Sequence, residues 1–253
     1  MKATKRLRSG CDAVKSTRTT KIRKYSDESV HEERDIIVNE QIVEIRTSER
    51  QLGVLRTSPG LEEYLALGFI LSMGHWPLSN HYPEVIRQDD YVLVILDEAS
   101  IEDHIRDIDD IFPLESDLIL TIDDIQEQLD YILEKQTIYQ KTSGTFSALL
   151  VDTIEYKKYF AEDINQYAAI DKVIGMGLAN GIQFPASYLL ITGPMPRDIV
   201  ERCIWVEIPL LGSSSVASDK GIQAAETFNI TLLGSIQSGS FSMYNQGAVR
   251  IGE

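Results

Sequence analysis

The sequence predicts an α/β fold built around a mixed sheet, and the C-terminal half provides most of the evidence. Apolar runs of strand length alternate there with segments whose apolar residues recur at helical spacing. Strands that alternate with helices imply parallel neighbours joined by right-handed crossovers. A chain of 253 residues with 43% hydrophobic content is long enough to bury such a core. The predicted strands are residues 146–153, 187–193, 208–212 and 230–234, with edge strands at 240–245 and 248–251, and the predicted helices are residues 168–181, 196–206 and 218–228.

The N-terminal half predicts a smaller α+β region. Residues 35–47 alternate apolar and polar side chains around a central Asn-Glu pair, which is typical of two short strands joined as a hairpin. Residues 61–72 predict a buried helix, and the continuous apolar run at residues 91–96 predicts a strand. A capping-box pattern then opens a further helix at residues 121–136.

Charge divides the chain into a basic beginning and an acidic remainder. Residues 1–24 hold nine Lys or Arg and one acid, whereas the other residues carry a net charge of −23. No aromatic residue interrupts the basic run to stack on bases, and the acidic remainder repels phosphate, so we do not expect nucleic-acid binding. The basic segment is predicted to be a disordered, solvated tail, and the other interpretation is a basic arm for an acidic partner.

Three parts of the chain are predicted from these patterns. Residues 1–30 form the basic, disordered tail. Residues 31–137 form the N-terminal region, which includes helix 121–136 and a loop at residues 97–117 with nine acids and one base. Residues 138–253 form the C-terminal α/β domain, whose sheet is expected to include part of the N-terminal region.

The cysteines and histidines argue against a disulfide or a metal site. The chain has only Cys11 and Cys203, and its four histidines lack the spacing of metal ligands. Cys203 lies in phase with the apolar residues of helix 196–206 and is predicted to be a core residue. The longest apolar stretch, residues 64–73, is too short to cross a bilayer, and no secretory signal is evident, so a cytoplasmic protein is expected.

Three of the predicted strands end alike, at a glycine. Ligands of open α/β sheets bind beyond the carboxyl ends of strands, where a missing side chain permits close approach to the backbone. Serines follow two of these ends, at residues 213–215 and in the turn 238–240, and add hydroxyl donors that suit phosphate. A ligand site is one interpretation, and the other is that the glycines only end strands and form turns. The pairs are Thr192-Gly193, Leu211-Gly212 and Leu233-Gly234.

An ordered series of motifs runs through the chain. It includes LRTSPGLEEYLALGFILSMG (55–74), KTSGTFSALLVD (141–152) and AEDINQYAAIDKVIGMGLANG (161–181). The series resembles the FdhD/NarQ family of formate dehydrogenase accessory sulfurtransferases. The third segment is the best match, to the family's E-D-x-G-R-H-N-A-x-D-K-x-x-G. The residues that it retains are Glu162, Asp163, Ala169, Asp171, Lys172 and Gly175.

The resemblance implies a cytidine-deaminase-like three-layer domain and a homodimer. Members of the family move sulfur from a cysteine desulfurase to a molybdenum cofactor that bears guanine dinucleotides and is used by formate dehydrogenase. The sulfur travels as a persulfide on a Cys-x-x-Cys loop after the strand that matches residues 91–96. In this chain that interval is the acidic loop 97–117, which contains no cysteine. A persulfide relay needs a positioned thiolate in positive surroundings, so we expect sulfur transfer to be lost.

The resemblance therefore predicts an accessory protein for the maturation of molybdenum or tungsten formate dehydrogenase, which binds molybdopterin guanine dinucleotide or a GDP-like nucleotide. No catalytic residue and no metal ligand is predicted. Two alternatives are an active sulfurtransferase that uses Cys11 or a partner's thiol, and an interaction subunit without a small ligand. The predicted cofactor-binding residues, which include the segment matching the family's guanine contact, are Thr192, Gly193, Ser213, Ser214, Ser215, Ser235, Ile236, Gln237, Ser238, Gly239 and Ser240.

Asp163, Asp171 and Lys172 offer two carboxylates and a cation within ten residues, which permits a catalytic interpretation. We favour structural roles, with Asp171 and Lys172 on a helix surface and Asp163 at the helix entry, where the helix dipole favours an acid. The zinc deaminase chemistry of the implied fold needs His-x-Glu and Pro-Cys-x-x-Cys, and the sequence contains neither.

Overall fold

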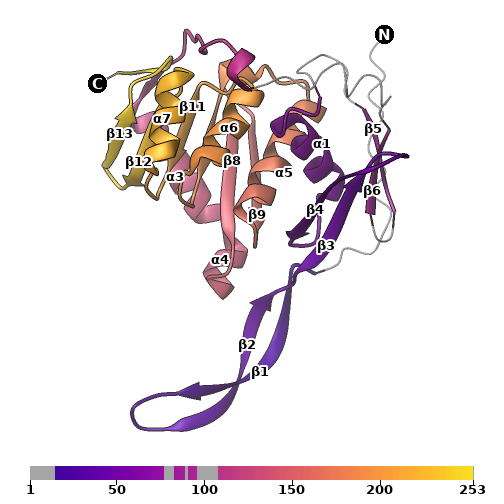
Figure 1. Ribbon diagram of the computed structural model, residues 1–253. Coiled ribbons are helices and arrows are strands. Elements are labelled where there is room, and N and C mark those ends of the chain that lie inside the picture. The colour runs from indigo at the N-terminus through magenta and orange to yellow at the C-terminus, as the bar shows by residue number, and fades with distance from the viewer. Residues whose placement is uncertain (1–14, 77–82, 89–90, 96–107, 253) are drawn as a thin grey trace.

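A six-stranded mixed sheet forms the centre of the molecule (Figure 1). The computed structural model describes residues 15–76, 83–88, 91–95 and 108–252. The strands lie in the order β13-β12-β11-β10-β8-β9, in which β10, β11 and β12 are parallel and the other neighbours are antiparallel. Their bounds are β8 Phe146–Asp152, β9 Lys158–Asp163, β10 Ser187–Ile191, β11 Leu210–Ser213, β12 Thr231–Gln237 and β13 Ser240–Asn245.

Helices cover both faces of this sheet and give it two hydrophobic cores. Leu150 and Leu211 point to the face that α5, α6 and α7 cover. Their neighbours Leu149 and Leu210 point to the opposite face, which α3 covers. Successive side chains of a strand alternate between faces, so continuously apolar strands of this kind are buried on both sides. The bounds are α3 Ile122–Lys135, α5 Gln166–Ala179, α6 Arg197–Trp205 and α7 Asp219–Thr227.

Helix α1 (Glu62–Ser72) connects this body to a second, smaller sheet. The helix is buried on nearly all sides, as expected of a segment that is apolar all round. It packs on α5 and on strands of a four-stranded sheet with the order β4-β3-β6-β5. The N-terminal region thus has an α+β arrangement of its own. The strands are β3 Gln41–Arg46, β4 Gln51–Thr57, β5 Glu84–Arg87 and β6 Tyr91–Ile95.

The two regions are also linked by a short parallel pair, β7 (Ile119–Thr121) with β14 (Arg250–Gly252). The six strands of the main sheet all come from residues 146–245. N-terminal residues therefore do not extend that sheet in the described part of the chain, contrary to our expectation. The remaining elements are α4 (Thr137–Thr142) and the short 3-10 helices Ile108–Asp110 and Phe184–Ala186.

A long two-stranded ribbon, β1 (Thr17–Tyr25) and β2 (Val30–Val38), projects from the body (Figure 1). The prediction of disorder is wrong for residues 17–25, and residues 1–14 lie outside the described residues. The predicted hairpin at residues 35–47 is also wrong in its pairing. Both of its strands form, but β2 pairs with β1, and β3 pairs with β4 and β6.

Most elements predicted from periodicity are confirmed within one to three residues. Thr121 caps α3 with the predicted capping box, in which its side chain accepts from the Asp124 N–H and Asp124 accepts from the Thr121 N–H. Of the predicted acidic loop 97–117, residues 97–107 lie outside the described residues. None of the helices in the described ranges combines the length and apolar character that crossing a bilayer requires.

Candidate functional site

The carboxyl ends of β10 and β11 border a pocket of about 520 Å³. Thr192 follows β10 and Ser214 follows β11, and both line the pocket. The facing wall is the end of α3 together with α4. Small-molecule sites have volumes of about 300 to 1,000 Å³, so the space suits a small ligand. The lining residues are Leu129, Ile132, Leu133, Gln136, Tyr139, Ser143, Gly144, Thr145, Phe146, Thr192 and Ser214.

The lining of the pocket combines apolar side chains with neutral polar groups. Of the described residues that line it, none is Lys, Arg, Asp or Glu. Thr192 Oγ1 accepts a hydrogen bond from the Ser147 N–H at 2.9 Å, which leaves the Thr192 hydroxyl proton to donate. The Ser214 hydroxyl donates to the Thr192 carbonyl oxygen at 3.4 Å, a long bond that a ligand can replace. The pocket therefore offers an apolar surface and hydroxyl groups, without a fixed positive charge.

Glu162 of the third motif holds one wall of this pocket in place. Its carboxylate accepts from the backbone N–H groups of Ile138 and Tyr139, at 3.0 and 2.8 Å, and from the Thr145 hydroxyl at 3.0 Å. The two N–H groups belong to the first turn of α4, where an acid is favoured by the helix dipole. A motif residue at the end of β9 thus positions a helix that precedes it in the chain.

Three of the predicted binding residues lie behind the pocket instead of lining it. Ser213 is fully buried, donates to the Gly193 carbonyl oxygen at 2.6 Å and accepts from the Ser215 N–H at 2.9 Å. These bonds tie the loop after β10 to the loop after β11. The hydrogen bonds of Ser213 therefore fix the two loops that carry the pocket-lining residues Thr192 and Ser214.

The three strand-end glycines do not form one level rim. Gly212 pairs with Leu233, not with Gly234, and Gly193 lies beyond the end of β10. The space beside each glycine is filled by the protein's own side chains: Gln166 at Gly193, Leu190 and Ile236 at Gly212, and Tyr244 at Gly234. In this structure the missing side chains serve internal packing, which neither interpretation considered from the sequence anticipated. Gly212 and Gly234 lie within β11 and β12 and do not end them.

Residues Ser235–Ser240 span the end of β12, the turn at Ser238 and Gly239, and the start of β13, and none of them lines the pocket. Ile236 is buried, and the Gln237 side chain donates to the Ser240 hydroxyl at 3.2 Å. The Gly239 N–H donates to Oε1 of Gln126 on α3, at 2.9 Å. The turn therefore packs on the helix that forms the pocket wall, about one helical turn from Leu129.

The sequence did not indicate that α3, α4 and Phe146 form a wall of the site. Phe146 begins a strand, and Leu133 lies on a helix that the periodicity presents as an ordinary amphipathic segment. Tyr139 lies on α4, a helix that the sequence analysis did not predict. Their convergence depends on how α3 lies across the sheet, which local spacing does not encode. The available signal was the second motif, residues 141–152, which contains Phe146 and the lining residues Ser143, Gly144 and Thr145.

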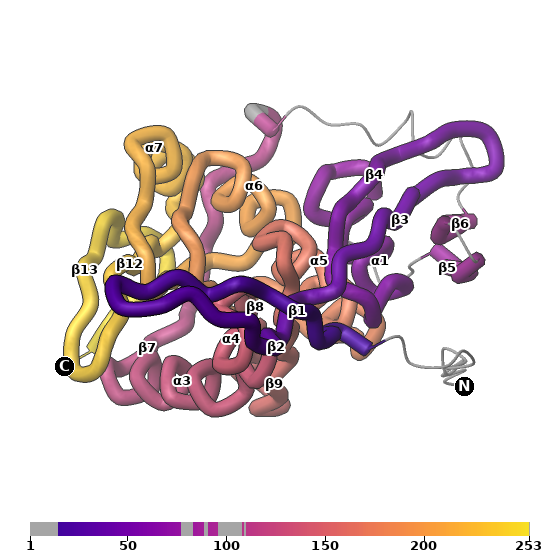
Figure 2. Tube along the Cα trace, turned by 90° about the horizontal axis from the view of Figure 1, so that it is seen from below, coloured from indigo at the N-terminus to yellow at the C-terminus, as the bar shows by residue number. Residues whose placement is uncertain are grey.

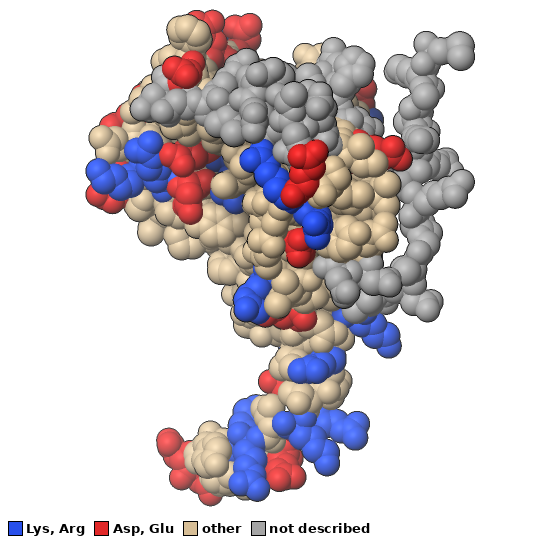
Figure 3. Space-filling model, turned by 45° about the vertical axis from the view of Figure 1, so that its right-hand side comes forward, with Lys and Arg blue, Asp and Glu red and all other residues tan. Residues whose placement is uncertain are grey.

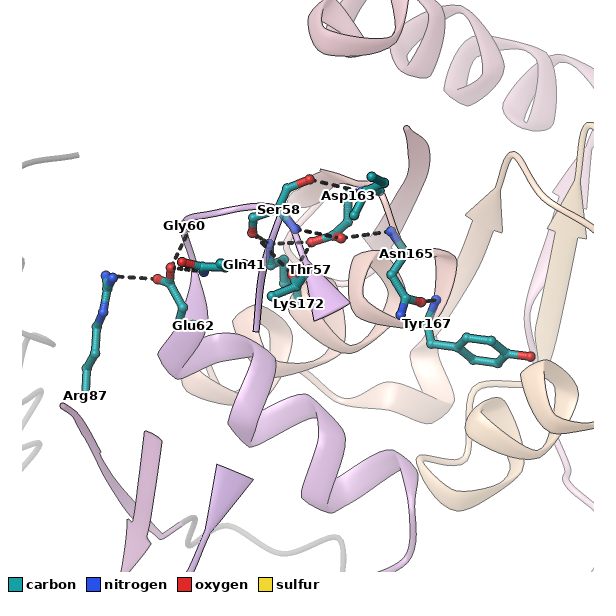
Figure 4. A network of polar contacts seen from close by, with 11 residues as sticks. Gln41, Thr57, Ser58, Gly60, Glu62, Arg87, Asp163, Asn165, Tyr167 and Lys172 are labelled. Carbon is teal, nitrogen blue, oxygen red and sulfur yellow. Dashed lines mark hydrogen bonds and ion pairs between the residues drawn. The ribbon is translucent and has the colours of Figure 1, made fainter. Parts of the chain in front are cut away.

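The remaining motif residues form a buried polar network between the N-terminal region and α5 (Figure 4). Lys172 Nζ donates to Asp163 Oδ2 at 2.6 Å and to the Ser58 carbonyl oxygen at 2.9 Å. Asp163 also accepts from the Thr57 hydroxyl and from the backbone N–H groups of Ser58 and Asn165. Asp163 and Lys172 are at most 1% exposed, so water reaches neither charge. The prediction that Lys172 lies on a helix surface is wrong.

Asp171 was also predicted on a helix surface and is also fully buried. Its Oδ1 accepts from the Ser72 hydroxyl at 2.7 Å and from Arg202 Nε at 3.1 Å. Burial raises the pKa of Asp171, and the charge of Arg202 and the two hydrogen bonds oppose that shift. Arg202 lies over the ring of Tyr167 at 4.7 Å. Asp171 therefore joins α5 to α1 and α6, and its role is structural.

Two glycines of the motifs allow α1 and α5 to touch backbone to backbone. A methyl group at Gly68 would lie 1.7 Å from the Asp171 carbonyl oxygen, and one at Gly175 would lie 1.9 Å from the Tyr64 carbonyl oxygen. No side chain fits at such distances. The first and third motifs therefore hold the two regions of the protein together, whereas Ser143–Phe146 of the second motif line the pocket.

Cys203, the one cysteine among the described residues, is a core residue as predicted. It is fully buried in the core formed by α1, α5, α6 and the sheet. Burial raises the pKa of its thiol to about 12, with a small opposing effect of Arg202. The thiolate form that sulfur transfer requires is therefore strongly disfavoured at this position.

Cys203 is expected to resist alkylation by iodoacetamide at neutral pH and to react only after unfolding. A thiol pKa of about 12 leaves the thiolate about a thousandfold scarcer than in free cysteine, and burial blocks access as well. Mass spectrometry of the Cys203 peptide, with and without guanidinium, measures this. Free cysteine in the same reaction controls for reagent activity, and alkylation of the folded protein within tenfold of its rate would contradict the assignment.

Comparisons with known proteins agree with the motifs. The model of the FdhD/NarQ family matches residues 94–251. "Sulfur carrier protein FdhD" of Methanothermobacter thermautotrophicus is 30% identical over 133 residues, 53% of each chain. "Protein FdhD" of Methanocaldococcus jannaschii is 27% identical over 228 residues, 90% of this chain and 96% of that protein.

The fold is also found in a solved structure. The crystal structure of a proposed formate dehydrogenase accessory protein from Desulfotalea psychrophila matches with a TM-score of 0.81 and 19% identity, over 91% of this chain and 97% of that chain. At this identity the match describes the fold alone. The family model, in contrast, spans more than half of the sequence, and on that match this chain belongs to the FdhD/NarQ family.

Proposed function

We propose that this protein is an accessory protein for a molybdenum or tungsten formate dehydrogenase which does not carry the sulfur itself. Relatives of this chain are named as FdhD sulfur carriers, which supports the formate dehydrogenase client. The observation that carries the proposal is the absence of cysteine from loop 97–117 together with the burial of Cys203. Loop 97–117 contains no cysteine, and Cys203 is sealed in the core with its pKa raised to about 12. Neither loop 97–117 nor Cys203 therefore offers the accessible thiolate that a persulfide relay requires.

The pocket beside Thr192 and Ser214 is the proposed ligand site. Its ligand is a guanine nucleotide, either GDP-like or part of molybdopterin guanine dinucleotide. Phe146 and Tyr139 provide apolar, aromatic surface against which a planar base can lie. The hydroxyls of Thr192 and Ser214 can donate to phosphate, but the lining has no cation, so we expect weak binding. Residues Ser235–Ser240 are proposed to contact the part of a larger cofactor that extends past the pocket.

Several finer features complete this proposal. Residues 138–253 form a cytidine-deaminase-like domain, and residues 31–137 form the smaller N-terminal region, whose helix α3 supplies the third layer on the main sheet. The protein works in the cytoplasm as a homodimer, next to a cysteine desulfurase and the formate dehydrogenase client. These features follow from the family resemblance, and each can be tested on the purified protein or in a pull-down.

Calorimetry with GDP tests the ligand site. We expect a Kd between about 0.1 and 1 mM, because hydroxyl donors contribute only about 0.5 to 1.5 kcal/mol each without a charged partner. Phe146→Ala is expected to weaken binding about tenfold through the loss of stacking, and Ser214→Ala several-fold. Ser147→Ala, adjacent to Phe146 but buried and outside the lining, is the matched control and leaves the Kd unchanged.

The outcomes of this titration distinguish the alternatives. No binding at millimolar GDP would eliminate the nucleotide hypothesis and favour an interaction subunit without a small ligand. A loss of binding on Gln237→Ala, with Phe146→Ala unaffected, would move the ligand from the pocket to the turn between β12 and β13.

A further inference from the structure

The β1–β2 ribbon has two faces of different chemistry. Side chains of directly paired residues lie on the same face, and the faces alternate along each strand. One face carries all three large apolar side chains of the ribbon that are exposed: Tyr25 at 72%, Val30 at 58% and Ile36 at 39%. We call it the arm face, and its residues are Thr19, Lys21, Arg23, Tyr25, Val30, Glu32, Arg34 and Ile36.

Charge on the arm face is not balanced within the ribbon. Lys21 lies directly opposite Arg34, and no acid lies within 4 Å of either one among the described residues. Like charges paired across two strands are destabilising. The arm face as a whole carries three cations and one acid, Glu32, which pairs with Arg23 at 3.6 Å. Because the arm face has a net positive charge, the surface that it binds is expected to be acidic.

The opposite face of the ribbon is balanced and better covered. Lys24 and His31 both lie within 3.4 Å of Glu33, and Ile22 and Ile37 are half-buried. The ribbon packs on the body mainly where β2 meets α4, and its far end stands clear of the body in Figure 1. In Figure 2, which looks from below, the ribbon lies in front of the body. Figure 3 shows its cations reaching solvent. Two-stranded ribbons are marginally stable alone, so a long ribbon is best explained by a surface that it covers.

Helix α3 presents a complementary surface. Its exposed side carries four acids, and Asp123 and Asp130 have no cationic partner within 4 Å among the described residues. Ile122 and Leu133 flank the acids and are 44% and 48% exposed. Eleven residues separate these two side chains, which places them on the same side of the helix. We call this surface the α3 stripe, and its residues are Ile122, Asp123, Glu127, Asp130, Leu133 and Glu134.

The two surfaces also match in length. The three cations of the arm face, Lys21, Arg23 and Arg34, lie between an apolar residue at one end, Ile36, and the apolar pair Tyr25-Val30 at the other. The distance from Ile36 to Val30 along β2 is about 20 Å at 3.4 Å per residue. On the α3 stripe, Asp123, Glu127 and Asp130 lie between Ile122 and Leu133 along the helix axis. Ile122 and Leu133 are about 17 Å apart at 1.5 Å per residue. Each surface thus has apolar side chains at both ends and charged side chains between them, over nearly the same distance, and the two sets of charges have opposite sign.

We propose that the arm face of one copy of this chain binds the α3 stripe of a second copy. A two-fold dimer makes this contact twice, because each copy supplies one arm and one stripe. The tip of the arm covers apolar side chains of the partner's α3 and its cations meet Asp123 and Asp130. The inference rests on the homodimer of the proposed function and names the surfaces that form it. Leu133 belongs both to the α3 stripe and to the pocket lining, so the test uses the protein without nucleotide.

Sedimentation velocity of the full chain without ligand tests this inference. The wild-type protein is expected to be a dimer at micromolar concentration. Lys21→Glu with Arg34→Glu is expected to raise the dimer Kd at least about a hundredfold, because like charges then face each other across the contact. The matched control is Arg18→Glu with Lys24→Glu, which makes the same change of net charge on the other face of the ribbon and keeps the dimer.

Charge exchange shows whether the two surfaces meet. Asp123→Lys with Asp130→Lys is expected to abolish the homodimer, and mixing this variant with the Lys21→Glu, Arg34→Glu variant is expected to restore a heterodimer. That recovery also shows that both variants are folded. A monomeric wild-type protein, or an arm variant that still dimerises, would overturn the proposal. Loss of the dimer in the arm variant without recovery on mixing would refute α3 as the partner surface.

Discussion

Replacing Lys172 with methionine is expected to lower the free energy of unfolding by about 3 to 5 kcal/mol. Methionine keeps most of the side-chain length but removes the cation that lies 2.6 Å from Asp163 Oδ2. The Asp163 carboxylate is then left buried, with hydroxyl and N–H donors but no counter-charge. An uncompensated charge in the interior costs far more than the pair contributes in net stability. Urea denaturation followed by circular dichroism measures the change.

Lys158→Met is the matched control for this experiment. Lys158 forms an ion pair with Glu127 at 2.8 Å, but the side chains are 24% and 69% exposed. Exposed pairs contribute about 0 to 1 kcal/mol, so this variant should unfold within about 1 kcal/mol of the wild type. Equal effects of the two substitutions would show that the Asp163-Lys172 pair is not the buried anchor that we describe.

Gly175→Ala is expected to produce the second large loss, of at least about 2 kcal/mol. A methyl group there would lie 1.9 Å from the Tyr64 carbonyl oxygen on α1. Backbone atoms cannot move aside as a side chain can, so α1 and α5 must separate. Since α1 also packs on the strands of the smaller sheet, the separation disturbs both regions. Alanine has a helix propensity about 1 kcal/mol more favourable than that of glycine. The measured loss of stability is therefore a lower bound for the cost of the steric clash.

Gly177→Ala on the same helix controls for propensity. A methyl group at Gly177 would meet only the ends of the Ile182 and Leu150 side chains, at 2.7 Å, and these can rotate away. We expect a change within about 1 kcal/mol. Thermal and urea unfolding of the two variants give the comparison, and a Gly175→Ala protein as stable as Gly177→Ala would contradict a direct backbone contact between α1 and α5.

Elements that depend on neighbours along the chain could be predicted from the sequence. The capping box at Thr121 and the apolar strands β10, β11 and β12 are local signals, and all formed as expected. The failures involve distant partners. Asp171 and Lys172 look like surface charges on α5 because helical periodicity does not reveal that α1, about one hundred residues earlier, covers that side of the helix.

The candidate site was predicted only in part, for the same reason. Thr192 and Ser214 were placed correctly at strand ends, because parallel strands end at one edge of a sheet. The glycines misled the prediction, since whether a missing side chain admits a ligand or a neighbour such as Tyr244 depends on tertiary packing. Strand β1 was missed because four of its nine residues are Lys or Arg, and its pairing with β2 sets its conformation.

The central claim is that this member of the family has no thiol placed to carry sulfur in the part of the chain that the structure describes. Incubation of the full chain with a cysteine desulfurase and isotopically labelled cysteine, followed by intact-mass and peptide mass spectrometry, tests it directly. An FdhD protein that has the Cys-x-x-Cys loop serves as the positive control. We predict that the control gains a labelled sulfur atom on its loop while this chain gains none on Cys203 or elsewhere. A labelled persulfide on Cys11 or Cys203, formed at a rate comparable to that of the control, would contradict the account.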